Sequence, residues 1–193
     1  MLKKQQGVFI VEFLIVLVLA TSLTVVVANH MLVLNQKGQL NRTSYSLATI
    51  VSERSLFDSE LRLCGSAMQC LAFVDTVHSI AVSTLNRTMG NFEVNKLGVR
   101  LSEVRLDSVS GGTEDFSLVS NTYDRGPLAG CSFGSLSNTT KRDALELLPF
   151  YNGQYMPLYK VSLCYEVPMD LIGGVSTGEL FHISSTSLSF ARL

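Results

Sequence analysis

The sequence predicts an α+β protein in which a long N-terminal transmembrane helix is followed by a small helix and an antiparallel β domain. Three observations predict this order. An apolar run occupies the N-terminus, apolar residues then recur in steps of three and four up to Leu85, and beyond Gly90 the period changes to two. Helices that precede strands favour α+β over a parallel α/β sheet.

The N-terminal run has the length of a membrane span. Of the 27 residues from Val8 to Leu34, 21 are apolar, and no charged side chain lies between Glu12 and Lys37. About 20 apolar residues are enough for a helix to cross a bilayer. Because Lys3 and Lys4 precede the run, we expect the N-terminus to stay in the cytoplasm and the chain from Lys37 onward to be exported.

Three interpretations compete for this N-terminus: a cleaved secretory signal, a permanent signal anchor, and a leader cut on the cytoplasmic side. Val26-Val27-Ala28 could serve as a secretory cleavage site, but the apolar run continues past it. The spacing of Gly7 and Glu12 favours the third interpretation. Glycine has no side chain to obstruct a protease, and a cut after it leaves a cationic amine on Val8, one helical turn before Glu12.

These residues resemble a class III signal of the type IV pilin kind. The resemblance rests on Lys3-Lys4-Gln5-Gln6-Gly7 followed by Val8 to Phe13, and an aromatic residue directly after the glutamate is similar to the tight adherence (Tad) branch. It implies that a prepilin peptidase cuts between Gly7 and Val8, and that Glu12, beside Phe13, aligns neighbouring subunits. The expected division is a leader at 1–7, a pilin-like transmembrane helix at 8–36 and an exported α+β head at 37–193.

Other stretches are similar to the TadF pseudopilins, and the chain is identified as a member of that family. They are Ser46 to Arg54, Cys64, Leu97 to Leu101, and Pro157 to Cys164. The resemblance implies a minor pseudopilin needed to assemble the Tad (Flp, type IVc) pilus, which supports surface adhesion and biofilm formation. The implied partners are the prepilin peptidase, other Tad pseudopilins and the Flp pilus platform. The implied location is the bacterial inner membrane, single-pass with a periplasmic head, or the pilus itself.

Two helices are expected in the first part of the head. The first continues the N-terminal helix, with a bend expected between Asn35 and Gly38, and the second follows it. The apolar stripe of the first is Leu40, Leu47, Ile50, Phe57 and Leu61, and that of the second is Leu71, Val74, Val77, His78, Ala81 and Leu85. We interpret His78 as a partly buried histidine with a hydrogen-bond partner.

Strands are expected after Gly90. Leu97, Val99 and Leu101 alternate, and the alternation resumes at Val104 and Leu106 after a slip of one residue, which predicts a bulge or a short turn. Further strands are expected at 116–118, 158–167 and 180–190. Turns are expected at Gly111-Gly112, at Asp124 to Pro127, at Asn152-Gly153 and at Gly173-Gly174.

The four cysteines all lie on the exported side of the expected membrane span. An even number in an oxidising compartment predicts two disulfides, for which three connectivities exist. We favour Cys64 with Cys70, which would clamp the turn after the long helix, and Cys131 with Cys164, which would pin a long loop to a strand. Zinc binding is the weaker alternative because the chain has no C-x-x-C pair and no clustered histidines.

Composition and motifs favour an assembly protein over an enzyme. The 15 basic and 16 acidic side chains are nearly balanced, which gives no basic footprint for nucleic acid. No G-x-S-x-G elbow, P-loop, H-E-x-x-H or dinucleotide fingerprint occurs, so we expect no catalytic residues, metal or cofactor. The alternative is a periplasmic binding domain held by a permanent signal anchor, without a role in pili.

Overall fold

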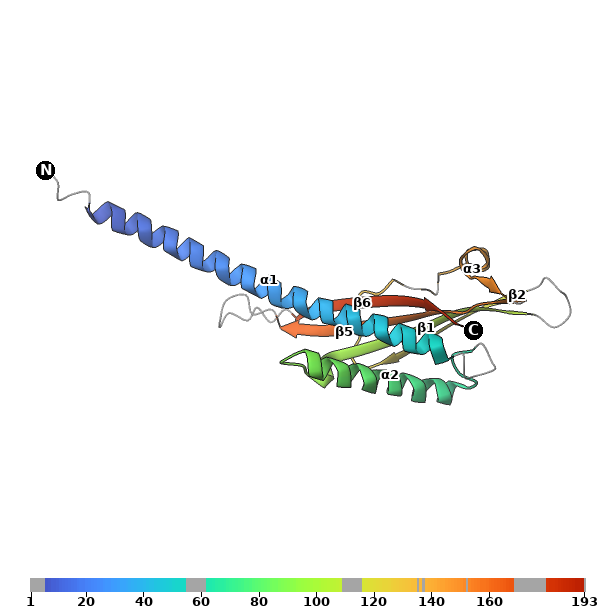
Figure 1. Ribbon diagram of the computed structural model, residues 1–193. Coiled ribbons are helices and arrows are strands. Elements are labelled where there is room, and N and C mark those ends of the chain that lie inside the picture. Colours follow the sequence, from blue (N-terminus) through green and yellow to red (C-terminus); the bar gives the residue numbers. More distant parts are fainter. Residues whose placement is uncertain are drawn as a thin grey trace. The chain divides into compact units, whose positions relative to one another are not determined.

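Figure 1 shows the computed structural model, which describes residues 6–54, 62–108, 116–134, 136, 138–151, 153–168 and 180–192. The chain forms two compact units. One consists of Met1–Gln36 with Val167–Phe181, and the other of Lys37–Glu166 with His182–Leu193. We call the second unit the head. The residues expected to form turns at Gly111-Gly112 and Gly173-Gly174 lie outside the described residues.

Helix α1 (Gln6–Arg54) is one continuous helix of 49 residues. It runs without interruption through Asn35 to Gly38, and the bend expected there remains a prediction. Its first part is rich in Val and Ile, which are mediocre helix formers in water. In a bilayer, a helix satisfies every backbone group within one segment, so the same sequence is suited to a membrane span.

The helices of the head bury one stripe each, close to the predicted ones. In α1 the buried apolar residues are Leu40, Leu47, Ala48 and Val51; in α2 (Ala67–Thr88) they are Cys70, Val74, Val77, Ala81 and Leu85. Two expected members are wrong, because Ile50 is 44% exposed and Leu71 is 55% exposed. Their sequence neighbours Val51 and Cys70 are buried instead. Phe57 and Leu61 lie outside the described residues.

A four-stranded sheet confirms the predicted α+β class. Its strands are β1 (Leu97–Ser108), β2 (Phe116–Arg125), β5 (Leu158–Pro168) and β6 (Leu180–Phe190), in the order β2-β1-β5-β6. β1 pairs antiparallel with both β2 and β5, and Figure 1 shows β6 running opposite to β5. The predicted turn at Asp124 to Pro127 follows β2 directly, with Gly126 at φ 77°.

The bulge expected in β1 is wrong. The register of β1 against β2 stays constant from Val99↔Arg125 to Ser108↔Phe116, so the strand contains no inserted residue. The apolar pattern slips because the buried face changes along the strand. Leu97, Val99 and Leu101 lie on the odd-numbered face, whereas Val104 and Leu106 lie on the opposite face, in a second apolar cluster.

The odd-numbered face packs against α1 and α2. His78 Nε2 on α2 lies 3.4 Å from Leu97 O, so this histidine is partly buried and partnered, as predicted. At the edge of the sheet, the buried Ser44 Oγ of α1 lies 2.7 Å from Ser185 Oγ and 2.9 Å from Ser187 Oγ on β6. These hydroxyls tie the first helix of the chain to its last strand.

The second apolar cluster lies under α3 (Lys141–Leu147) and the short hairpin of β3 (Phe150–Tyr151) and β4 (Gln154–Tyr155). Its buried members are Val104, Leu106, Ala144, Leu148 and Leu158. Of the turn predicted at Asn152-Gly153, Gly153 lies between the two strands of the hairpin with φ 82°, and Asn152 lies outside the described residues. The cluster explains why the distal half of β1 buries its even-numbered residues.

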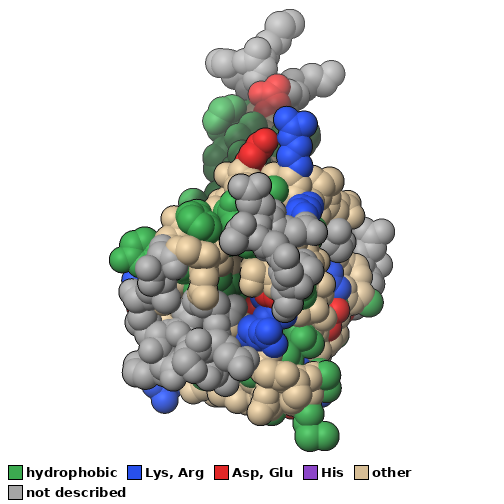
Figure 2. Space-filling model, turned by 90° about the vertical axis from the view of Figure 1, so that its right-hand side faces the viewer, with side chains coloured by type: hydrophobic (Ala, Val, Ile, Leu, Met, Phe, Trp, Pro, Cys, Tyr) green, Lys and Arg blue, Asp and Glu red, His purple; other side chains and the backbone are tan. Residues whose placement is uncertain are grey.

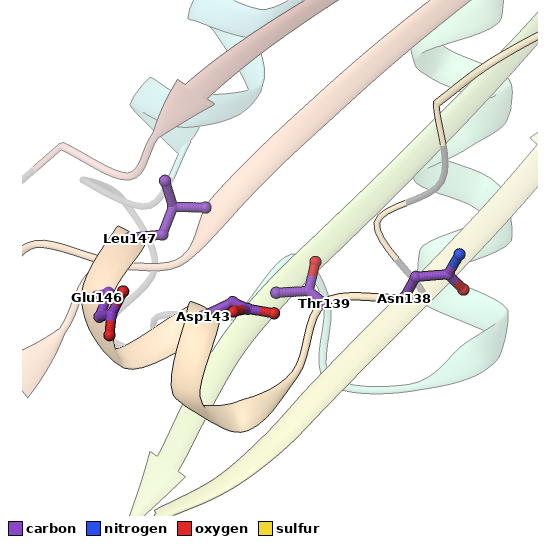
Figure 3. Close-up of a pocket in the computed structure, with 5 residues that line it drawn as sticks. All are labelled: Asn138, Thr139, Asp143, Glu146 and Leu147. Carbon is purple, nitrogen blue, oxygen red and sulfur yellow. The ribbon is translucent and has the colours of Figure 1, made fainter.

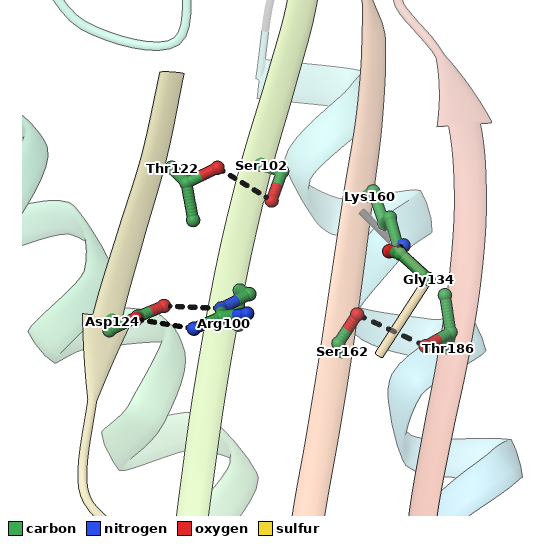
Figure 4. Close-up of polar contacts among 8 residues, drawn as sticks. All are labelled: Arg100, Ser102, Thr122, Asp124, Gly134, Lys160, Ser162 and Thr186. Atoms are coloured by element: carbon green, nitrogen blue, oxygen red, sulfur yellow. Dashed lines mark hydrogen bonds and ion pairs between the residues drawn. The ribbon is translucent and has the colours of Figure 1, made fainter. Parts of the chain in front are cut away.

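The rest of the even-numbered face is polar and is crossed by a loop, Gly126 to Gly134, which we call the strap. Figure 4 shows polar pairs between neighbouring strands of this face: Arg100 with Asp124, Ser102 with Thr122, and Ser162 with Thr186. Lys160 Nζ donates to Gly134 O of the strap. The strap lies so close to β1 that a Cβ on Gly98 would stand 2.1 Å from Pro127 O, which only glycine avoids.

Candidate assembly helix and the charged groups of the head

The first part of α1 exposes a continuous apolar surface. Most of its large hydrophobic side chains from Phe9 to Leu34 are exposed, and the most apolar window of the helix is not buried at all. By length and composition both α1 and α2 could cross a membrane, but α2 packs one stripe against the sheet. An apolar surface of this extent is a site for a membrane or for other helices.

Hydroxyl groups within this surface are satisfied by the helix itself. Thr21, Ser22 and Thr24 donate to carbonyl oxygens three or four residues earlier, at distances between 2.8 and 3.0 Å. A hydroxyl that bonds to its own helix loses little when water is removed. These three residues are therefore compatible with a hydrocarbon environment.

Glu12 has no such hydrogen-bond partner on its own helix. Its side chain is exposed, and within the described part of the chain it has no hydrogen-bond or ion-pair partner. Phe13 beside it is 58% exposed. Gly7 and Val8 lie in the first turn of α1, so Val8 precedes Glu12 by one helical turn. A carboxylate in an apolar segment costs about 3 kcal/mol and is a functional candidate whose partner has to be supplied.

Glu103 is the opposite case in the head. This carboxylate is only 2% exposed, and its Oε1 accepts a hydrogen bond from Leu63 N at 2.9 Å. Burial raises the pKa of Glu103, while the hydrogen bonds from Leu63 and Asn121 and the charge of Arg105 act in the other direction. Its contact fixes the segment just before Cys64, so we assign Glu103 a structural role.

Lys160 is buried on the other face of the sheet. Its ammonium donates to Gly134 O of the strap, and burial, followed by the charge of Arg100, lowers the pKa of Lys160. Arg100 forms a two-point pair with Asp124, at 2.8 Å for both contacts, and its guanidinium lies 5.3 Å from the ring centre of Phe133. These charges hold the strap on the sheet.

A shallow cleft of about 490 Å³ lies beside α3 (Figure 3), lined by Asn138, Thr139, Asp143, Glu146 and Leu147. Its two acids are engaged in local contacts. Asp143 Oδ2 accepts from Thr140 N and Oγ1, which lowers the pKa of Asp143, and Glu146 pairs with Arg142 at 3.4 Å. Asp143 therefore serves in the N-terminal cap of α3 and Glu146 in a surface ion pair, an arrangement that gives no sign of an acid and base pair.

The two disulfides join the cysteine pairs that the sequence favours. Cys64 bonds to Cys70 with a Cα separation of 5.3 Å, across the start of α2, where Ser66 caps the helix. Cys131 of the strap bonds to Cys164 of β5 with a Cα separation of 6.1 Å. Both bonds constrain loops next to regular structure.

Charges on the head are mixed. Figure 2 shows that the end of the head at which β2 and α3 lie carries Lys, Arg, Asp and Glu side chains interspersed with one another. In the described ranges, no three His, Cys, Asp or Glu side chains are grouped so that they could hold a metal ion. Among the described residues, the charged pairs of the head are structural, and Glu12 is an acid without a hydrogen-bond or ion-pair partner in the apolar part of α1.

Sequence reasoning missed the buried charges of the head. Glu103 continues the alternation of Leu97, Val99 and Leu101, and that position was the signal that its carboxylate would lie on a buried face. Lys160 carried no such signal, because its burial depends on the strap, which comes from a distant part of the sequence.

Comparison with known proteins gives one result. The family model described as "Putative tight adherence pilin protein F" (TadF) matches residues 1–192. No curated protein and no solved structure matches the chain.

Proposed function

The chain belongs to the TadF family of tight adherence pilin proteins, and from that premise we propose that it is a minor pseudopilin for assembly of the Tad (Flp, type IVc) pilus. Prepilin peptidase removes residues 1–7, the helix stays in the inner membrane with the N-terminus cytoplasmic, and the head lies in the periplasm. Other Tad pseudopilins and the Flp pilus platform are its partners. The pilus that they build supports surface adhesion.

The observation that carries this proposal is the unpartnered carboxylate of Glu12 on an exposed apolar helix. Cleavage after Gly7 creates an amine on Val8, and in a helix bundle the amine of one subunit meets Glu12 of its neighbour. A buried ion pair adds little net stability, but a register that leaves either charge alone is strongly penalised. The pair therefore fixes the axial alignment of subunits, while the apolar surface supplies the attraction between them.

Intact mass and N-terminal sequencing of the protein purified from its native membrane test the proposal. The mature chain should begin at Val8. A Gly7→Leu variant should keep all seven leader residues, because the bulkier side chain blocks the peptidase, whereas Gln5→Leu should be cut normally. A wild-type chain that still begins at Met1 would contradict the proposal and leave a periplasmic binding domain on a permanent anchor.

A further inference from the structure

A groove lies between the head portions of α1 and α2. It has a volume of about 450 Å³ and is lined by Gln39, Arg42, Thr43, Ser46, Thr84 and Thr88. Of the four residues from α1, Gln39, Arg42 and Ser46 follow one another in steps of three and four, with Thr43 next to Arg42, so they form a polar stripe beside the buried apolar one. The groove lies entirely within the head.

Several groups in this groove have unused bonding capacity. Thr43 is only 4% exposed, and within the described ranges its hydroxyl has no hydrogen-bond partner. Gln39 Oε1 is likewise buried without a partner among those residues. Arg42 has no ion-pair partner there either. A buried polar group without a partner costs about 1–3 kcal/mol, and this cost applies to Gln39 Oε1, whereas Arg42 is exposed to solvent.

The two walls of the groove offer different chemistry. On the α1 side, the guanidinium of Arg42 and the hydroxyls of Thr43 and Ser46 can donate. On the α2 side, Thr84 already donates to Ile80 O at 2.9 Å and Thr88 to Thr84 O at 3.1 Å, so their oxygens face the ligand as acceptors. A matching ligand has anionic oxygens at one end and hydroxyl donors at the other.

The position of the groove along the helix identifies the source of such a ligand. Gln39 and Arg42 follow Leu34, the last residue of the apolar run, by five and eight residues. At a rise of 1.5 Å per residue this is about 7 to 12 Å beyond the hydrocarbon, next to the headgroup layer, and arginine side chains reach back toward it. The lining residues carry one cation and no acid, which favours a ligand of single negative charge.

We propose that this groove binds the headgroup of phosphatidylglycerol from the outer leaflet of the membrane. The phosphate accepts hydrogen bonds from Arg42 and Thr43, and the glycerol hydroxyls donate to the threonines of α2. The inference rests on the membrane insertion in the proposed function, but not on cleavage or pilus assembly. The bound lipid would hold the head against the bilayer before the subunit leaves it.

Native mass spectrometry of the full chain, released from detergent after mixing with phosphatidylglycerol, tests the site. The wild type should retain one phosphatidylglycerol in preference to phosphatidylethanolamine. Arg42→Gln should lower its affinity by about tenfold or more, since a hydrogen bond to a charged group is removed. Arg87→Gln, which removes an exposed arginine of α2 that does not line the groove, should bind like the wild type.

Thr43→Val separates binding from folding. The variant keeps the shape of the side chain, and its affinity for the lipid should fall several-fold. Its free energy of unfolding should not fall, because the hydroxyl has no partner in the described chain. If the role of Thr43 were purely structural, the Thr43→Val variant would instead have a lower free energy of unfolding.

The inference is overturned if Arg42→Gln retains lipid as well as the wild type, if Arg87→Gln loses as much as Arg42→Gln, or if phosphatidylethanolamine binds equally. Equal binding of inorganic phosphate by calorimetry would also overturn it in favour of a soluble anion. Carbonate extraction separates the two proposals. A chain that remains in the membrane but is neither cut nor assembled refutes the proposed function alone.

Discussion

Two glutamates show how differently the two regions of the molecule are built. Glu103 in the head is buried and receives the amide of Leu63 within the same chain. Glu12 on the N-terminal part of α1 is exposed, and it has no partner among the described residues. Glu103 is thus satisfied within the head, whereas the proposed partner of Glu12 comes from a neighbouring subunit.

The same contrast holds for apolar side chains. In the head portion of α1, Leu40 and Leu47 are fully buried in the chain's own core, whereas Leu19 and Leu32 farther toward the N-terminus are exposed. One continuous helix therefore buries its apolar side chains in the core of the head and exposes those of its N-terminal portion, which we propose contacts lipid and neighbouring subunits. Four predictions test how sharp this division is.

Glu12→Ala should give the largest effect, a loss of pili to the background level, because the aligning charge is removed while the head is untouched. Processing should be normal, since Gly7 and Val8 are unchanged. Sheared pili counted by immunoblot in a complemented deletion strain measure the effect. Glu53→Ala, which removes a partly buried acid paired with Arg192 at the head end of the same helix, is the control. Normal piliation in Glu12→Ala would refute the alignment role.

Removal of the disulfides should affect only the head. In the loop-entropy description, the loss of Cys131–Cys164, which closes 33 residues, costs about 4 kcal/mol, and the loss of Cys64–Cys70, which closes 6, costs about 2 kcal/mol. Urea unfolding of the two double alanine variants in detergent, followed by circular dichroism, measures both. If the shorter loop proved the more important one, loop entropy would not be the main source of the stabilisation.

Two leucines of α1 should separate the regions directly. Leu47→Ala should lower the unfolding free energy of the head by about 3 kcal/mol, because the side chain is 1% exposed and its removal leaves a cavity. Leu19→Ala makes the same chemical change at an exposed position and should leave the urea midpoint of the head unchanged. Equal losses in the two variants would mean that the head depends on the N-terminal part of the helix.

Glu103 should give the smallest effect, but one that depends on pH. Because burial raises its pKa above the ordinary 4.5, the folded head holds this proton at pH values where the unfolded chain has released it. Its contribution is fully present below about pH 4.5 and is lost as the pH rises through the raised pKa. Glu103→Gln should remove that dependence, and Glu103→Ala should cost about 1–3 kcal/mol by leaving the Leu63 amide without an acceptor. Urea titrations from pH 4 to pH 7.5 test both expectations, and a flat profile for the wild type would contradict the assignment.

Elements with a strong local period could be predicted from the sequence. α1, α2 and the strands follow the steps of the apolar residues, and the class of the fold follows from their order. The errors at Ile50 and Leu71 arise because a step of three and a step of four end on adjacent residues, and the pattern alone does not decide which of the two is buried. Packing in the head selects Val51 and Cys70. The prediction of a bulge in β1 was wrong because the apolar pattern shows only which residues are buried. It does not show that different elements cover the two faces of the strand along its length.

The contacts made by the strap could not be predicted. Lys160 and Gly98 are fixed by a loop about 30 residues away in sequence, and no local pattern announces such a contact. The groove between α1 and α2 was also missed, although Gln39, Arg42 and Ser46 form a polar stripe at helical spacing. That stripe could have indicated a polar site on α1, but the groove also needs the hydroxyls that α2 places opposite.

The serine contact between α1 and β6 has a consequence for the timing of biogenesis. Ser44 lies 141 residues before Ser185 and 143 before Ser187, so this contact cannot form until nearly the whole chain has been synthesised. Contacts of such long separation form late, because the chain entropy of a large loop must be lost first. With the N-terminus held in the cytoplasm as proposed, a prematurely terminated chain would lack β6. One edge of its hydrophobic core would then be exposed to solvent. Such a chain would be marked for proteolysis in the envelope before it could enter a fibre.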